Sequence, residues 1–141
     1  MRIPDVNVLL YAYDDASPQH RAARVWLERS LSSAEPTGFA WVTLLGFIRL
    51  GTRAAAFPQP LSPGEALEIV ESWLAHPHAS PVDPGDGHPA ILRELLEAAG
   101  VAGDLTTDAH LAAIAIERGA SLATFDGDFH RFAGLKLEFL R

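Results

Sequence analysis

The hydrophobic positions of this chain fall into two kinds of segment, short apolar runs and longer amphipathic stretches. A short apolar run bounded by turn-forming residues favours a buried β-strand, whereas apolar residues that recur every three or four positions favour a helix. On this basis we expect strands at residues 2–5, 38–41, 77–82, 121–125 and 135–140.

The amphipathic stretches between these runs are expected to be helices, and several have recognisable ends. Ser17-Pro18 matches an N-cap followed by proline at the first helical position, and Thr107 is expected to cap a later helix. Ser62 and Glu65 match a capping box, and Gly100 matches a C-cap. The expected helices span about 17–32, 42–54, 62–74, 89–99 and 108–118, and a short helix or loop follows Asn7.

Strands that alternate with helices predict an α/β fold around a mostly parallel sheet. A chain of 141 residues, of which 48% are hydrophobic, is expected to form one domain over residues 1–141 with a substantial core. No cysteine is present, so disulfides and thiolate metal sites are excluded. No apolar run approaches the roughly 18–20 residues that a membrane helix needs, and Asp5 interrupts the N-terminal apolar stretch too early for a signal peptide. We therefore expect a soluble, cytoplasmic protein.

The formal net charge of −7 disfavours broad, non-specific binding to a nucleic-acid backbone, which requires a basic surface. It does not exclude a nuclease, because carboxylates that hold a divalent cation are themselves negative and the cation bridges to phosphate. An acidic surface also suits a basic protein partner.

Four aspartates are placed where a site is expected in a parallel sheet, outside the carboxyl ends of the strands. Asp5 ends the first predicted strand, and Asp126 and Asp128 follow the fourth. Asp108 lies in the first turn of the helix that precedes this fourth strand. The topology is expected to bring these residues, which are distant in sequence, to one edge of the sheet.

Converging carboxylates repel one another, and without a cation some of them would take up protons. Oxygen-only ligands suit hard cations such as Mg²⁺ or Mn²⁺. Such a cation lowers the pKa of a bound water, which can attack a phosphodiester without a nucleophile from the protein. The aspartates therefore indicate metal-dependent phosphoryl chemistry.

Each of these aspartates also has an ordinary structural interpretation. Asp5 could be a helix cap or part of a buried ion pair, and Asp108 a common first-turn acid. Asp126-Gly127-Asp128 could be a simple turn. A zinc site is disfavoured, because Pro77 prevents His76 and His78 from forming a helix-face pair and no HExxH motif occurs.

Four stretches of the chain resemble one known family. They are PDVNVLLYA at residues 4–12, AWVTLLGFIRLGT at 40–52, LTTDAHLAAIAIERGA at 105–120 and LATFDGDFHRF at 122–132. In this order they resemble the PIN-domain ribonucleases, and within them the VapC-like toxins of toxin–antitoxin pairs. The DxN pattern alone is weak, but its combination with TDAHLAA and TFDGDF is specific.

The resemblance implies a single-domain α/β/α sandwich that cleaves RNA endonucleolytically with Mg²⁺ or Mn²⁺. By position, Asp5, Asp108 and Asp126 look like metal ligands, and Asp128 looks like an acidic residue that assists them directly or through water. Asn7 would orient Asp5 or a bound water. The implied substrate is a structured RNA, such as transfer RNA or ribosomal RNA.

The resemblance also implies a role for Thr124, which would hydrogen-bond within the acidic cluster. The family further implies a homodimer and a cognate antitoxin. The antitoxin is expected to block the acidic pocket with a basic side chain. These partners follow from the resemblance and not from any pattern in the chain itself.

One departure from the family pattern concerns the helix after the second strand. Many members carry a glutamate there, but Gly46 takes this position and no acidic residue occurs between Glu35 and Glu65. A second metal would then bind weakly or only with substrate phosphate, and Arg49 and Arg53 on this helix are candidates to contact phosphate instead.

Two other functions stay open, and the missing glutamate bears on the first of them. One is a catalytically degenerate PIN domain that binds RNA or protein without cutting it. The other is a nuclease for DNA flaps or single strands, although the lack of an added helical arch or DNA-binding domain counts against it.

Overall fold

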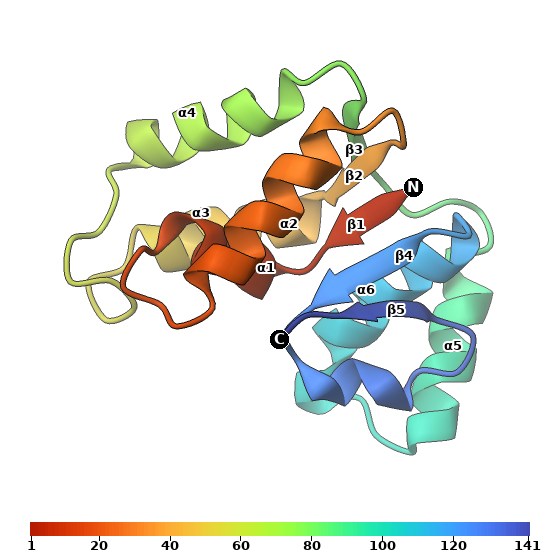
Figure 1. Ribbon diagram of the computed structural model, residues 1–141. Helices are drawn as coiled ribbons and strands as arrows, with labels where there is room; N and C mark the ends of the chain where they lie inside the picture. Colours follow the sequence, from red (N-terminus) through yellow and green to blue (C-terminus); the bar gives the residue numbers. More distant parts are fainter.

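A five-stranded sheet forms the centre of the molecule, with strand order β3-β2-β1-β4-β5 and every neighbouring pair parallel (Figure 1). The computed structural model describes all 141 residues. The parallel sheet expected from the sequence is therefore confirmed. Its strands are β1 (Arg2–Pro4), β2 (Thr37–Ala40), β3 (Ala79–Val82), β4 (Ser121–Thr124) and β5 (Lys136–Phe139).

Helices cover both faces of this sheet, which confirms the α/β/α sandwich (Figure 1). One face carries α1 (Val6–Tyr13), α2 (His20–Ser32), α3 (Trp41–Gly51) and α4 (Pro63–Leu74). The other face carries α5 (His88–Ala99) and α6 (Thr106–Glu117). Two short 3₁₀ turns, η1 (Gly103–Leu105) and η2 (Gly127–Arg131), lie before α6 and after β4.

The strands supply two hydrophobic cores because successive side chains point to opposite faces of a sheet. In β2, Phe39 joins the core under α1 to α4, whereas Ala40 joins the core under α5 and α6. In β4, Ala123 joins the core under α1 to α4, and Leu122 joins the core under α5 and α6. Burial on both faces explains why these strands are continuous apolar runs in the sequence.

Several predicted helix ends are confirmed. Ser62 caps α4 by accepting a hydrogen bond from the Glu65 N–H at 3.2 Å, and the Glu65 side chain accepts one from the Ser62 N–H at 3.0 Å. Gly100 ends α5 in the left-handed conformation, with φ +74°, which glycine adopts without a Cβ penalty.

Two predicted N-caps are wrong. Helix α2 begins at His20, and the Ser17 hydroxyl instead accepts a hydrogen bond from the Gln19 N–H within the preceding turn. Helix α6 begins at Thr106, so Thr107 lies inside it. The turn η1 leads directly into α6 with helical backbone at Leu105, which leaves no extended N-cap position for a side chain to occupy.

The strand order creates a crevice at the carboxyl ends of β1 and β4. Strand β1 is central, with β2 on one side and β4 on the other. The chain runs outward from β1 to β2 and β3, and then outward from β4 to β5 in the opposite direction. Ligand sites of open parallel sheets form at such a switch point.

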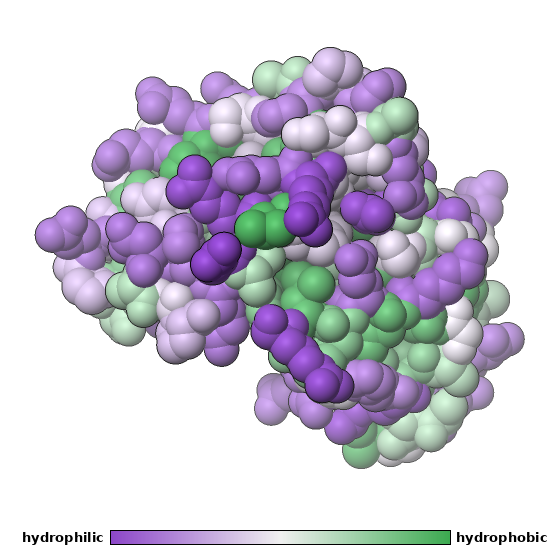
Figure 2. Space-filling model, in the orientation of Figure 1, coloured by the Kyte–Doolittle hydropathy of each residue, from purple (hydrophilic) through white to green (hydrophobic).

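None of the helices combines the length and the apolar character that a membrane-spanning helix requires. Figure 2 shows a largely hydrophilic surface over α2 and α4 and a hydrophobic area over β4 and β5.

Candidate active site

Asp5 lies at the carboxyl end of β1 and also begins α1. Its backbone N–H donates to the Ala123 carbonyl at 2.9 Å, which continues the pairing with β4. Its Oδ1 accepts a hydrogen bond from the Val6 N–H at 2.7 Å and caps α1. The side chain is buried, with 6% of the residue exposed. The helix-cap interpretation of Asp5 is therefore correct, and it is compatible with a place in the acidic cluster.

The second oxygen of Asp5 belongs to a network that joins β1 to β4. Oδ2 accepts hydrogen bonds from the Thr124 hydroxyl at 2.7 Å and from Asn7 Nδ2 at 2.9 Å. The Asn7 amide also donates to Thr124 Oγ1 at 3.1 Å and accepts from the Phe125 N–H at 3.1 Å. Asn7 and Thr124 thus hold the Asp5 carboxylate in one orientation.

Thr124 connects this network to the next acidic residue. Its hydroxyl has one proton and two lone pairs. The proton is donated to Asp5, and the oxygen accepts from the Asn7 amide and from the Asp126 N–H, the latter at 3.0 Å. This buried hydroxyl is therefore fully hydrogen-bonded, and it fixes where the chain carrying Asp126 leaves β4.

Asp126 and Asp128 form the turn that their sequence suggested. Asp126 Oδ1 accepts a hydrogen bond from the Asp128 N–H at 2.8 Å and caps η2. The Asp128 side chain is 65% exposed and forms an ion pair with Arg131 at 3.8 Å. Both carboxylates nevertheless lie near enough to the site to raise the pKa of Asp108.

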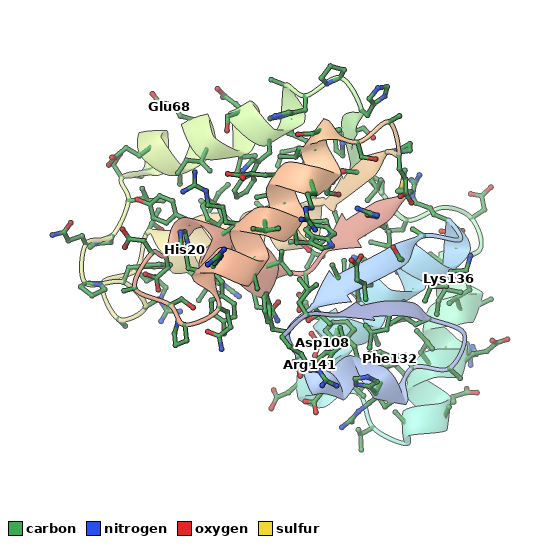
Figure 3. All side chains as sticks on the ribbon, in the orientation of Figure 1. His20, Glu68, Asp108, Phe132, Lys136 and Arg141 are labelled. Carbon is green, nitrogen blue, oxygen red and sulfur yellow. The ribbon has the colours of Figure 1, made fainter.

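Asp108 lies in the first turn of α6 (Figure 3), and its side chain makes no hydrogen bond or ion pair within the protein. Its pKa is raised to about 6, first by partial burial and then by the negative charges of Asp5, Asp126 and Asp128, with Arg131 opposing them. The pKa of Asp5 is also raised, mainly by burial and further by the negative charge of Asp126. The hydrogen bonds from Thr124, Val6 and Asn7 oppose this shift because they favour the charged form. The four predicted carboxylates therefore interact across one site.

Two cavities meet at Asp108. The first, of about 250 Å³, is lined by Asp5, Asp108, Gly46 and Arg49 together with apolar side chains. The second, of about 340 Å³, is lined by Asp108, Asp128 and Arg131 among others. Asp108 thus separates a cavity bounded by the start of α1 and by α3 from one bounded by η1 and η2.

The sequence reasoning did not anticipate two residues that line the first cavity, Thr43 and Thr107. Thr43 is buried in α3, and its position could have been found from the helical spacing to Gly46 at i+3. Thr107 was misread as a cap. The histidines form no metal cluster; instead His88 and His110 share a hydrogen bond of 2.9 Å between Nε2 and Nδ1.

Comparison with known proteins assigns this chain to a family. Residues 2–135 match the PIN domain. Over 136 residues the chain is 46% identical to ribonuclease VapC37 of Mycobacterium tuberculosis, covering 96% of this chain and 94% of the relative. It is 40% identical to ribonuclease VapC33 of the same organism, covering 96% and 95%. The chain is a PIN domain of the VapC ribonuclease family.

The fold of this PIN domain also matches a solved complex, VapBC2 from Rickettsia felis bound to a DNA fragment from their promoter. The TM-score is 0.70 at 19% sequence identity, covering 99% of this chain and 98% of that chain. At this identity the likeness concerns the fold alone.

Gly46 lies in the wall of the first cavity of this PIN domain. A Cβ built there would approach Val6 Cγ2 to 3.1 Å, so the side chain of Val6 would have to give way to any larger residue. The cavity therefore has carboxylates only from Asp5 and Asp108, without one from α3.

A divalent cation, which the family resemblance implies, fits the chemistry of this donor set. The donors are carboxylate oxygens, and the raised pKa values of Asp5 and Asp108 reflect burial and repulsion by neighbouring carboxylates, which a cation would relieve. No three histidine, aspartate or glutamate side chains come close enough to enclose an ion by themselves. Mg²⁺ is commonly held by one or two carboxylates, while water and substrate phosphate complete its coordination.

Proposed function

We propose that this PIN domain is a Mg²⁺- or Mn²⁺-dependent endoribonuclease, the toxin of a VapBC-type pair, which cleaves structured RNA such as transfer RNA or ribosomal RNA. The observation that carries the proposal is the pair Asp5 and Asp108, two carboxylates that line one cavity and have raised pKa values. When bound there, the ion would supply an acidified water and neutralise phosphate charge.

The hydrogen bonds of Asp5 indicate which of its oxygens would hold the ion. Oδ2 already accepts from Thr124 and Asn7, whereas Oδ1 accepts only from the Val6 N–H. Since each carboxylate oxygen has about two acceptor sites, Oδ1 retains the free one. Asn7 and Thr124 would thus act as positioning residues that keep this oxygen directed at its ligand.

Asp108 would be the second ligand, and its lack of fixed partners lets it adjust to the ion. Asp126 is proposed as a third ligand, and Asp128 as a residue that assists directly or through water. Both contribute negative charge at Asp108 already.

The proposed partner is a cognate antitoxin. Solved structures of similar fold include complexes named VapBC from Rickettsia felis and from Salmonella typhimurium. A basic side chain of the antitoxin would be attracted to the carboxylates of the first cavity, in a chain whose net charge is −7. We also propose a homodimer, as the family resemblance implies.

The test is cleavage of total RNA by purified, antitoxin-free protein in Mn²⁺, Mg²⁺ or EDTA. Asp5→Asn and Asp108→Asn variants, purified identically, serve as controls against a contaminating ribonuclease. Discrete fragments that require both the metal and the two aspartates are expected. Full cleavage by both variants would refute the site assignment, and preferential cleavage of single-stranded DNA run in parallel would favour the DNA nuclease.

A binding module is the second candidate function. It is favoured by one observation, the absence of a carboxylate at Gly46 in the cavity wall. Calorimetry with Mn²⁺ and the cleavage assay together separate the two functions, because a degenerate PIN domain would bind the ion but would cleave no RNA.

A further inference from the structure

One basic side chain lines the acidic cavity. Arg49 is three residues after Gly46 on α3, so the two share a helix face, and both line the cavity with Asp5 and Asp108. Arg53, the other cation near this helix, lies beyond its end at Gly51 and does not line the cavity. The structure thus distinguishes between two arginines that the sequence left equivalent.

The Arg49 side chain is exposed and has no partner within the protein. It forms no ion pair with any carboxylate, although two carboxylates line the same cavity. On the other side of Asp108, by contrast, Arg131 is paired with Asp128. The Arg49 guanidinium therefore keeps its hydrogen-bond donors available for a ligand that enters the cavity.

A protein of net charge −7 with clustered carboxylates repels RNA at the place where it is proposed to cut. Some positive charge beside the site must offset this repulsion. A guanidinium is suited to the task, because its planar donors match two phosphate oxygens at once and its charge persists at every physiological pH.

We propose that Arg49 binds a phosphate of the RNA backbone in this cavity, in the space that Gly46 leaves beside it; this rests on the ribonuclease function proposed above. A glutamate at position 46, which the family resemblance implies, would add negative charge to the cavity and require a further cation. Here the cavity wall instead has no side chain at Gly46 and a fixed positive charge one turn later. Arg49 would therefore lower the energy of the bound phosphate directly, by charge-assisted hydrogen bonds.

The test compares Arg49→Ala and Arg49→Lys with Arg53→Ala, which removes the same charge outside the cavity. Affinity for a short single-stranded RNA is measured by fluorescence anisotropy at several salt concentrations. An Asp108→Asn background is used so that turnover cannot interfere. Arg49→Ala is expected to weaken binding about tenfold and to reduce the slope of log affinity against log salt by about 0.7, the contribution of one phosphate contact to a single strand. Arg49→Lys should restore the slope but not the full affinity, and Arg53→Ala should change neither.

The same variants in the active protein give a second measurement, the salt dependence of kcat/KM. Equal effects of Arg49→Ala and Arg53→Ala would overturn the proposal. So would a lower Tm for Arg49→Ala with an unchanged salt slope, since that is the result expected if Arg49 only complements the carboxyl end of α3. Failure of the unmodified protein to cleave any RNA would instead count against the ribonuclease function, and the binding data would still decide the role of Arg49.

Discussion

At the scale of single residues, Asp5 shows how one side chain can serve both the fold and the site. It caps α1 through Oδ1 and anchors Asn7 and Thr124 through Oδ2. A substitution at Asp5 therefore changes stability as well as chemistry, and the choice of substitution decides which effect is measured.

Asp5→Ala is expected to lower the free energy of unfolding by about 1–3 kcal/mol, because it removes an N-cap and leaves the buried Thr124 hydroxyl without its acceptor. Asp5→Asn keeps one acceptor oxygen, which can serve either the Val6 N–H or the donors at Oδ2 but not both, so it should cost less than Asp5→Ala. Both variants should lose cleavage. Urea denaturation at pH 7 measures the difference. Equal stability of Asp5→Ala and the unmodified protein would show that the network contributes nothing to the fold.

Asp108 is expected to make the metal-free protein less stable as the pH rises. Its folded pKa, about 6, lies above its ordinary value of 3.8, so the folded state binds the proton more tightly than the unfolded state. Protonated Asp108 therefore makes its full contribution to the free energy of unfolding below about pH 3.8. This contribution is lost as the pH rises through about 6.

Chemical denaturation in EDTA between pH 4 and pH 7.5 tests this dependence. Asp108→Asn should be more stable than the unmodified protein at neutral pH, and the advantage should shrink toward pH 4, where Asp108 is largely protonated. An Asp108→Asn advantage that stays constant over this range would contradict the assignment.

At the scale of elements, the site depends on how strands and helices begin and end. Four of its acidic residues occupy the first positions after a strand or the first turn of a helix. The helix α4, by contrast, carries a strong cap at Ser62 that lies outside both acidic cavities. It therefore provides a way to lower stability without touching the site.

Ser62→Ala is expected to cost about 1 kcal/mol, because the Glu65 N–H loses its acceptor and the capping box is broken. The thermal midpoint should fall by a few degrees while the rate of RNA cleavage at 25 °C stays unchanged. Differential scanning calorimetry and the cleavage assay together measure both quantities. A parallel loss of activity would mean that α4 influences the site through the packing of α3.

At the scale of the whole molecule, the acidic site is a local concentration of charge in a chain that is already negative. A ligand that binds only the folded state stabilises it by mass action. Because the carboxylates of the site repel one another without a cation, the protein should be more stable with one bound.

Addition of Mn²⁺ at pH 7.5 is therefore expected to raise the Tm of the unmodified protein by several degrees. The shift should be lost in Asp108→Asn and kept in Asp86→Asn, which removes the same charge from an exposed loop. Thermal denaturation with and without EDTA measures it. An equal shift in all three proteins would indicate that the ion binds elsewhere.

Much of this architecture could be predicted from the sequence because it depends on local patterns. The apolar runs of a sheet buried on both faces, the capping box at Ser62 and the C-cap at Gly100 are each decided by neighbouring residues. The two wrong caps fail for a related reason: the sequence near Ser17 and Thr107 permits a cap, but the preceding turn determines where each helix begins.

The sequence by itself determined the α/β class, the parallel sheet and the four aspartates that follow strands or open a helix, since hydrophobic periodicity and residue chemistry are properties of the chain. Only the tertiary structure decided that Asp5 caps α1 while bonding Asn7 and Thr124, that Asp108 stands between two cavities, and that Arg49 rather than Arg53 lines the first of them. The physical reason is that these features depend on distances between segments brought together by the strand order, and on the burial and repulsion that arise only when those segments meet.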